Sequence, residues 1–455
     1  MNIKTKLSVK DLHQYQRKCC NTILARDKLF LLLDMGLGKS VSVLTSIEYL
    51  QRERGYGPAL IIAPLRVCYS VYPDEIKKWD QLKNLTYHII HGPGKTKPLP
   101  KANLYIANFE SLQFVLDSKV WQKCDILVID EITFVKNSKT KRFQILKKMV
   151  GSFKKKIGMT GSPSGSGELT EFFSMTYLLD EGKRLGTSFW QFRNKYYSSD
   201  FMGYKWELKP GARKRIEDKI RPISITMTAK DYLDMPDKTY NNILVDLPTK
   251  AKDIYLEMEK EFIVQLQDDT ITAANAAVKT SKLRQITAGC LYNEEHKYKI
   301  IHKAKIDALK EIIEGIDGNV LLGFQFKFER DMIQQAIPEA RFIDGSTNMK
   351  DSMQNIKDFN SNKIKLLCCH PASTSHGINL QKFCNTLVWL SRDFSLERTG
   401  QYEARIHRQG QTKKVFIHTI ACKNTIDLAV IAALSRKSEG QSATINALKD
   451  YVKGR

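Results

Sequence analysis

The stretch LFLLLDMGLGKSVSVLTSIEYL, residues 29–50, decides the fold class. It begins with an apolar run typical of a buried strand and ends with the apolar pattern of a buried helix. Between them, Gly36 and Gly38 allow a tight turn whose backbone N–H groups can face an anion, and the N-terminus of the following helix favours negative charge. This order predicts a parallel α/β sheet. The turn is either a phosphate-binding loop or an ordinary connection.

Two side chains directly after the turn favour the phosphate-binding alternative. The strict pattern G-x-x-x-x-G-K-[ST] is not met, because Leu33 occupies the position of its first glycine. Lys39 can nevertheless reach the β- and γ-phosphates of a nucleotide, and the Ser40 hydroxyl can bind Mg²⁺. We therefore predict ATP and Mg²⁺ as ligands, with Lys39 as a catalytic residue and Ser40 as a metal ligand.

A second apolar run, CDILVID at residues 124–130, is followed by a second carboxylate. In parallel sheets, ligands bind where the strands end. Asp130 is predicted to bind Mg²⁺ directly or through water, and Glu131 to orient and deprotonate the attacking water. A solvated acidic turn is the alternative, and the loop at Lys39 in the same chain favours the catalytic interpretation.

Strand-like runs alternate with helical patterns in two regions of the chain. The first region contains LFLLL, ALIIAP, LTYHII, ANLYIAN, CDILVID and KKIGMTG, and the second contains NVLLGF, ARFIDG, IKLLCCH, TLVWLS and VFIHTIA. Between about Ser164 and Ala288 the sequence predicts long polar helices and irregular stretches. We expect two α/β lobes, residues 1–237 and 238–455, with helical insertions from about 165 and up to about 300, and a charged helical tail over 425–455.

The charge balance favours a polyanionic partner. Lys and Arg total 72 against 49 Asp and Glu, which gives a net charge of +23. Phosphate contacts release counterions and add affinity that does not depend on sequence, so nucleic acid is the predicted partner.

The nine cysteines form no C-x-x-C pair, and we expect no zinc site. The N-terminus lacks an apolar signal core and no run is long enough to cross a bilayer, which predicts a cytoplasmic protein without a membrane partner.

The C-terminal half supplies a third motif, QYEARIHRQGQ at residues 401–411. Helical i,i+3 spacing would place Arg405 and Arg408 on one face. Two guanidinium groups there can act as arginine fingers on a γ-phosphate, or they can contact the phosphate backbone of a nucleic acid.

Taken in order, these motifs resemble those of the superfamily 2 helicases, and among them the Swi/Snf-like DNA-dependent ATPases, especially compact phage-type members. The similarity runs over nearly the entire chain, through LHQYQRKCC, DMGLGKS, LIIAPLRVCYSVYPDEIKKW, YIANFESL, DEIT, GMTGSP, HPASTSHGINL and QYEARIHRQGQT. The resemblance implies two RecA-like lobes that bind ATP between them and move on DNA. It also implies that the arginine pair acts on the nucleotide.

The resemblance assigns residues to the nucleotide and to DNA. ATP binding is implied for Tyr15, Gln16, Met35, Gly36, Leu37, Gly38, Lys39, Ser40, Gly377 and Gln401, and Gln411 is expected in the same cleft. DNA contact or coupling is implied for Pro64, Asn108, Thr160, Gly161, Ser162 and Asn379. The chain has DEIT where DEAH is more usual, and Ser373-Thr374-Ser375 where the family has a double glycine, so DNA contact at that turn stays open.

We expect an ATP-dependent translocase that tracks along duplex DNA in replication, recombination or repair. One alternative is a strand-separating helicase at forked DNA, which would need a wedge such as YYSSDFMGYKW at 196–206. Another is a slow ATP-switched DNA-binding protein. The basic stretches at 139–148 and 211–219 are candidate phosphate contacts or, equally, solvated faces. A monomer would suffice for a two-lobed cleft, in the host cytoplasm if the chain is phage-encoded.

Overall fold

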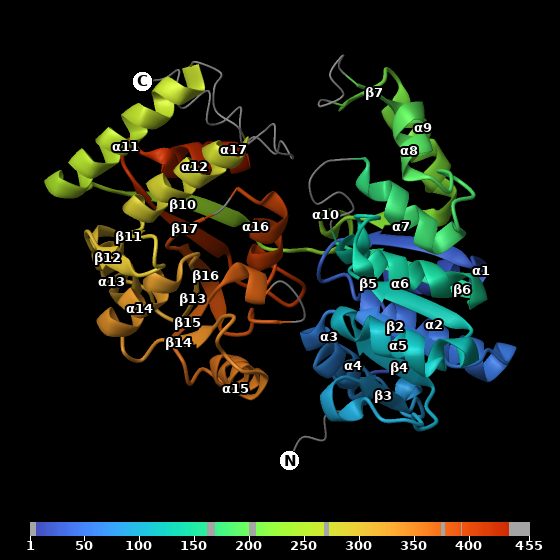
Figure 1. Ribbon diagram of the computed structural model, residues 1–455. Helices are drawn as coiled ribbons and strands as arrows, with labels where there is room; N and C mark the ends of the chain where they lie inside the picture. Colours follow the sequence, from blue (N-terminus) through green and yellow to red (C-terminus); the bar gives the residue numbers. More distant parts are fainter. Residues whose placement is uncertain are drawn as a thin grey trace. The chain divides into compact units, whose positions relative to one another are not determined.

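The computed structural model describes residues 6–161, 169–199, 206–267, 273–374, 378–392 and 394–435. The chain separates into two compact units, Met1–Leu233 and Asp234–Arg455. Each unit contains one large parallel sheet with helices packed against it (Figure 1). None of the helices in the described ranges combines the length and the hydrophobicity needed to cross a membrane.

Unit 1 is built on a seven-stranded sheet with the order β3-β4-β2-β5-β6-β1-β9. Its strands are β1 (Lys28–Leu33), β2 (Ala59–Ala63), β3 (Tyr87–Ile90), β4 (Leu104–Asn108), β5 (Ile126–Asp130), β6 (Lys155–Thr160) and β9 (Ser224–Met227). All neighbouring pairs are parallel. Strands β2, β4, β5 and β6 are buried along their whole length. Burial on both faces explains why these strands are near-continuous apolar runs in the sequence.

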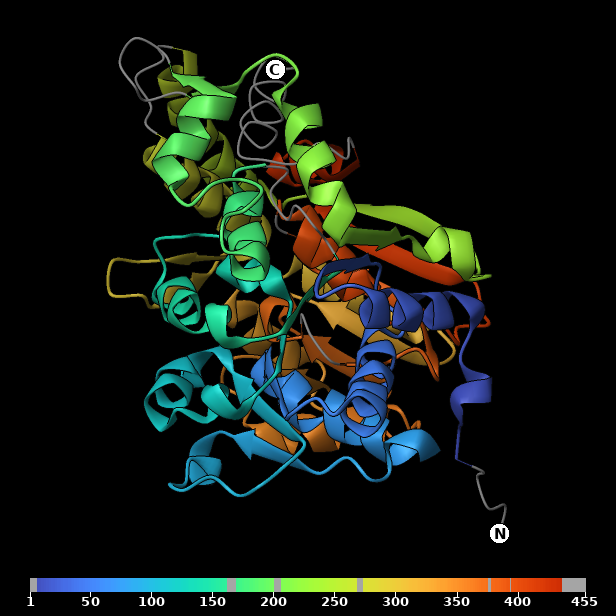
Figure 2. The same cartoon turned by 90° about the vertical axis from the view of Figure 1, so that its right-hand side faces the viewer.

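Helices cover both faces of this sheet. They are α1 (Gln14–Ala25), α2 (Lys39–Arg54), α3 (Leu65–Tyr69), α4 (Val71–Lys78), α5 (Leu112–Ser118), α6 (Lys141–Met149), α7 (Glu171–Asp180), α8 (Phe189–Tyr196), α9 (Ala212–Ile220) and α10 (Ala229–Tyr232). The apolar faces of α1, α2 and α4 belong to one core cluster, and those of α5 to α9 belong to another. Figure 2 shows α1 and α2 in blue on one side, with the teal and green helices on the other.

The register of the sheet brings three strand ends together. Leu32 near the end of β1 is paired with Thr160, the last residue of β6. Met159 of β6 is paired in turn with Asp130, the last residue of β5. The glycine turn, the acidic pair and the end of β6 therefore share one edge of the sheet, where ligands bind in folds of this kind.

Unit 2 is built on a six-stranded sheet with the order β10-β17-β16-β13-β15-β14. Its strands are β10 (Lys238–Val245), β13 (Asn319–Gly323), β14 (Arg341–Ile343), β15 (Leu366–Cys369), β16 (Cys384–Trp389) and β17 (Val415–Cys422). All pairs are parallel. Its helices are α11 (Thr249–Gln267), α12 (Ala273–Thr287), α13 (Ala304–Glu314), α14 (Lys327–Ala336), α15 (Met349–Phe359), α16 (Leu396–Glu403) and α17 (Ile426–Ser435). The expected fold class, two parallel-sheet α/β lobes, is confirmed.

The structure differs from the sequence analysis between residues 164 and 288, where strands were not expected. The edge strands β9 and β10 lie there, together with the short hairpin of β7 (Tyr197–Ser199) and β8 (Trp206–Leu208). A second hairpin, β11 (Cys290–Tyr292) and β12 (Tyr298–Ile300), follows α12. The predicted helical tail is confirmed over Ile426–Ser435, and residues 436–455 lie outside the described residues.

All nine cysteines are buried. Desolvation raises the pKa of the Cys19, Cys68 and Cys384 thiols to about 12. Such thiols stay protonated at neutral pH and pack as small apolar side chains, as their apolar sequence context predicts.

Candidate nucleotide site

The glycine turn between β1 and α2 has the conformation that a phosphate loop requires. Gly36 and Gly38 have φ angles of 86° and 67°, in the left-handed region that favours glycine. Gly38 is the N-cap of α2, which begins at Lys39. A Cβ on Gly38 would lie only 2.2 Å from Nε2 of Gln16. The turn therefore needs glycine at Gly38 for its backbone angle and for the close approach of Gln16. Met35 and Leu37 complete the turn, and Leu37 is buried.

The Lys39 ammonium lies inside this turn. Its Nζ donates to the carbonyl oxygens of Leu33 at 2.6 Å and Asp34 at 3.2 Å. A Cβ on Gly161, which follows β6, would lie 3.7 Å from the same Nζ. The positive charge of Lys39 also lowers the pKa of Asp130, against the larger effect of burial. Lys39, Asp130 and Gly161 are thus neighbours, although the sequence separates them widely.

The two carboxylates after β5 have different surroundings. Asp130 is only 7% exposed and accepts a hydrogen bond from the Tyr72 hydroxyl at 3.0 Å. Burial raises the pKa of Asp130, while Lys39 and the Tyr72 hydrogen bond oppose that shift. Glu131 adopts a left-handed φ of 58°, and its Oε2 accepts from Oγ1 of Thr160 at 3.2 Å. Asp130 is held by Tyr72 of α4, and Glu131 is held by the end of β6.

The oxygen donors at this edge fit Mg²⁺. Ser40 stands in the first turn of α2 and Asp130 ends β5, so a hydroxyl and a carboxylate are available. Hard oxygen ligands of these two kinds, completed by water and phosphate oxygens, are what Mg²⁺ prefers. In such a site the ion neutralises phosphate charge.

The start of α1 lies against the turn. Gln16 is 4% exposed, and its Oε1 accepts from the backbone N–H of His13 at 3.0 Å. The other end of the same amide, Nε2, lies against Gly38. The Tyr15 ring stacks on His13 with 5.3 Å between centroids and packs against Tyr232 at 5.4 Å. The structure therefore places Gln16, a predicted ATP ligand, beside the predicted phosphate loop.

Three residues of this region have no role in the sequence analysis. Tyr72 reaches Asp130 from α4, and Tyr232 reaches Tyr15 from α10. Asp34 accepts from the backbone N–H of Ala229 at 2.8 Å, and its own N–H donates to the Met227 carbonyl at 3.0 Å. Asp34 carried a usable signal, since it is an acid between a strand and a glycine turn. No sequence pattern marks the two tyrosines.

Two residues predicted to couple ATP hydrolysis to DNA lie at the ends of neighbouring strands of the same sheet. Pro64 follows β2 and caps α3, and Asn108 ends β4. Asn108 is 2% exposed, donates to Glu110 at 2.8 Å and accepts from the Ser111 hydroxyl. Its amide shapes the turn that follows β4. Ser162, predicted as a coupling residue, lies outside the described residues, as does Gly377.

In unit 2 the two predicted finger arginines converge on one carbonyl. Nη1 of Arg405 and Nη1 of Arg408 donate to the Ile378 oxygen at 3.1 and 3.3 Å. The expectation that they lie on a helix face is wrong, because α16 ends at Glu403. The chain continues in turns with i→i+3 backbone bonds, such as Arg405 N–H to Tyr402. The two guanidinium groups nevertheless reach the same carbonyl, that of Ile378.

The remaining predicted residues of unit 2 differ in their surroundings. Gln401 is 5% exposed and donates to Glu397 at 3.2 Å. Gln411 donates to the carbonyls of Cys384 at 2.9 Å and Ile406 at 3.1 Å, so its amide ties the turn to β16. Asn379 is exposed, and its carbonyl accepts from Asn360 at 2.8 Å.

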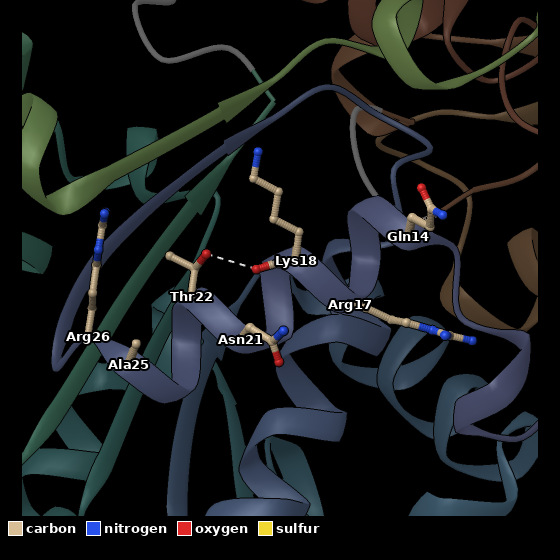
Figure 3. Close-up of a pocket in the computed structure, with 7 residues that line it drawn as sticks. All are labelled: Gln14, Arg17, Lys18, Asn21, Thr22, Ala25 and Arg26. Carbon is tan, nitrogen blue, oxygen red and sulfur yellow. Dashed lines mark hydrogen bonds between the residues drawn. The ribbon is translucent and has the colours of Figure 1, made fainter.

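A shallow hollow of about 500 Å³ runs along the outer face of α1 (Figure 3). None of the seven residues that line it is a predicted ATP ligand. Arg17 and Arg26 extend from this face, and both donate to backbone carbonyls, of Leu12 at 3.1 Å and Ser224 at 3.3 Å. Tyr15 and Gln16 belong to the opposite, buried face of the helix. The hollow is therefore separate from the candidate nucleotide site.

Comparison with known proteins identifies the family of the chain. A family model described as the SNF2-related domain matches residues 12–306. Protein p41 of Acyrthosiphon pisum secondary endosymbiont phage 1 is 31% identical, over 96% of this chain and 98% of p41. The chain also resembles the DNA annealing helicase and endonuclease ZRANB3 of Mus musculus, at 24% identity over 94% of this chain. An uncharacterized ATP-dependent helicase of Mycoplasma genitalium, MG018, is 25% identical over 95% of this chain.

The chain spans 40% of ZRANB3 and 42% of MG018. Among solved structures, the SWI2/SNF2 ATPase core of Sulfolobus solfataricus in complex with dsDNA is 22% identical. That similarity covers 94% of this chain and 91% of the other, with a TM-score of 0.46. The family match covers more than half of the chain, and the p41 match covers nearly all of both proteins. The chain therefore belongs to the SNF2-related family and is an ATP-dependent helicase or DNA-dependent ATPase core of that family.

Proposed function

We propose that this protein is an ATP-dependent translocase that moves along duplex DNA. The observation that carries the proposal is the meeting of Lys39, Asp130 and the Thr160–Glu131 hydrogen bond at one sheet edge of unit 1. This edge combines a phosphate-binding cation, a metal ligand and a candidate base. The net charge of +23 and the relative named a DNA annealing helicase support DNA as the partner.

In this proposal, each group at the edge has one task in hydrolysis. Lys39 exchanges its bonds to the loop carbonyls for bonds to the β- and γ-phosphates, which keeps its ammonium paired throughout. Ser40 and Asp130 would hold Mg²⁺, which would supply positive charge at the phosphates, and Glu131 takes the proton of the attacking water. Tyr15 and Gln16 hold the base. Arg405 and Arg408 approach the γ-phosphate when the lobes close.

Coupling to DNA is proposed to run through the end of β6. Thr160 donates to Glu131 and is followed directly by Gly161 and Ser162, the segment predicted to sense DNA. A shift of this segment on DNA binding would change how Glu131 is held. We propose residues 1–237 and 238–455 as the two moving lobes, in a monomer that works in the cytoplasm of a phage-infected host, in replication, recombination or repair.

The test is ATP turnover by the full chain with Mg²⁺, measured with and without saturating duplex DNA. We expect strong stimulation by the duplex. Lys39→Ala should lower turnover by at least about 100-fold, because transition-state charge loses its partner. Glu131→Gln should bind ATP normally and fail to hydrolyse it. Arg52→Gln, at an exposed position in the last turn of α2, serves as a charge-removal control. Background turnover with saturating duplex would leave the slow ATP-switched binding protein as the function.

A paired assay separates tracking from strand separation. A translocase displaces the third strand of a triplex without separating the underlying duplex. A helicase at forked DNA releases a strand from a fork. We expect triplex displacement that needs ATP and is lost in Glu131→Gln. Fork unwinding at a comparable rate would make strand separation the function.

A further inference from the structure

A groove of about 440 Å³ lies on unit 1 among α6, α7 and α8, helices that neighbour one another in Figure 1. It includes residues of the basic stretch 139–148, to which the proposed function gives no task. Its rim carries Trp190, whose side chain is 70% exposed, the highest value among the large hydrophobic residues described. An exposed tryptophan costs solvation free energy unless a partner covers it.

The floor of the groove is a fixed aromatic cluster. Phe143 and Phe173 are each 2% exposed. Tyr177 packs against Phe143 with 5.8 Å between ring centroids, and Phe189 packs edge-on against Phe173 at 5.5 Å. These ring contacts give the groove a rigid apolar floor.

The ionised side chains that line the groove are all cationic: Lys139, Lys147 and Arg193. Lys147 Nζ lies 5.0 Å from the centre of the Tyr177 ring, and the Arg193 guanidinium stacks 3.9 Å from the centre of Trp206. Within the described ranges, none of the three forms an ion pair with a carboxylate. The groove therefore offers positive charge around aromatic faces, which complements a chain of phosphates carrying flat bases.

We propose that this groove binds an unpaired DNA strand, with a base stacked on Trp190 and its phosphates beside Lys139, Lys147 and Arg193. A duplex keeps its bases stacked inside and cannot offer one to Trp190, so the groove prefers single strands. This inference goes beyond tracking on duplex DNA: it gives the motor a second contact, for DNA that carries both a duplex and a single-stranded part.

The first test measures binding of a fluorescein-labelled oligothymidylate of roughly 20 nucleotides, and of a duplex of equal length, to the full chain. Trp190→Ala should weaken oligothymidylate binding by about 5- to 100-fold and change duplex binding by less than about twofold. Trp190→Phe, which keeps a ring, should restore most of the affinity. Phe383→Ala is the matched control, because Phe383 is 44% exposed with Lys382 over its ring and lies in unit 2.

Two adjacent lysines on α6 provide a second test of the groove. Lys147 and Lys148 are adjacent on α6 and both exposed, but only Lys147 lines the groove. Lys147→Gln should weaken oligothymidylate binding and reduce its salt dependence by about one phosphate contact, while Lys148→Gln should not. Equal losses of oligothymidylate affinity in Lys147→Gln and Lys148→Gln would overturn the proposal. Equal losses of oligothymidylate and duplex affinity in Trp190→Ala would also overturn it.

The competing ligand is an acidic protein segment, which polyglutamate represents. Competition by polyglutamate that depends on Trp190, with no Trp190-dependent oligothymidylate binding, would assign the groove to a protein instead. The proposal for the groove and the proposed motor function can be tested independently. Lys39→Ala should lose ATP turnover and keep Trp190-dependent binding, and Trp190→Ala should keep duplex-stimulated turnover.

Discussion

Gly38 combines a backbone requirement with a packing requirement, and Gly55 allows the two to be separated. Both glycines have left-handed φ angles, 67° and 65°, and both flank α2. A Cβ at Gly55 would meet nothing within 4 Å, whereas one at Gly38 would strike Gln16. Gly55→Ala should therefore cost only the left-handed strain, about 1–2 kcal/mol.

Gly38→Ala should destabilise the protein more than Gly55→Ala and weaken ATP binding by at least about tenfold, since the Gln16 amide must move away from the turn. Thermal unfolding and nucleotide titration of the two variants check this. The double variant Gly38→Ala with Gln16→Ala should recover part of the lost stability. Normal ATP affinity in Gly38→Ala would contradict the importance of this close approach.

The Tyr72 hydroxyl contributes to the pKa of Asp130, together with burial and Lys39. Burial raises the pKa of Asp130, and the hydrogen bond from Tyr72 favours the charged form and so lowers that pKa. Tyr72→Phe removes the hydrogen bond, so the carboxyl should become protonated at higher pH. The acid limb of the pH profile for ATP turnover should then move to higher pH, with more Mg²⁺ needed for half-maximal rate.

The pH profile of Tyr105→Phe is the control for this substitution. Tyr105 is also buried, and its hydroxyl donates to the Pro100 carbonyl at 3.0 Å, away from any carboxylate of the candidate site. Its acid limb should stay in place. An unmoved acid limb in Tyr72→Phe would mean that Asp130 does not set the low-pH limit of turnover.

Arg405 and Arg408, in the turns that follow α16, have unequal structural roles. Arg405 is 4% exposed and donates to the Gln401 and Ile378 carbonyls, whereas Arg408 is half-buried and donates to Ile378. Arg405→Ala should lower the free energy of unfolding by about 1–3 kcal/mol, because buried carbonyls lose a donor. Arg408→Ala should unfold at nearly the wild-type temperature.

Both substitutions should reduce ATP turnover by about a thousandfold if the two residues act as fingers. Calorimetry and turnover with saturating duplex DNA separate the two effects. Arg398→Ala, at an exposed position on α16, is the control. Wild-type turnover in a folded Arg408→Ala variant would remove Arg408 from the reaction.

Whether a strand could be predicted from the sequence depended on how it is buried. Strands such as β2 and β5 are buried on both faces and read as continuous apolar runs, so they could be predicted. The edge strand β10 alternates exposed and half-buried residues, and its KTYNNILV sequence lacks such a run. Its place in the sheet is set by pairing with β17, nearly 180 residues away, which no local pattern reports. The convergence of Arg405 and Arg408 on Ile378 is equally non-local.

The net charge of +23 makes a quantitative prediction about the protein and DNA together. Each phosphate that a lysine or arginine neutralises releases counterions, so the logarithm of the affinity falls linearly with the logarithm of salt concentration. With about six or more contacts, duplex affinity should fall at least about a thousandfold between about 50 and 200 mM salt. Fluorescence anisotropy with Glu131→Gln and ATP holds the nucleotide state constant during the titration.

The nucleotide provides the internal comparison for that titration. ATP affinity measured without DNA depends on a few groups in a partly buried site, where salt screens less, so it should change only a few-fold over the same range. Subtracting this change leaves the dependence that belongs to DNA. A slope equivalent to about two contacts would mean that most of the excess positive charge faces solvent. The duplex would then have to be held mainly by hydrogen bonds from uncharged groups at the ends of the strands.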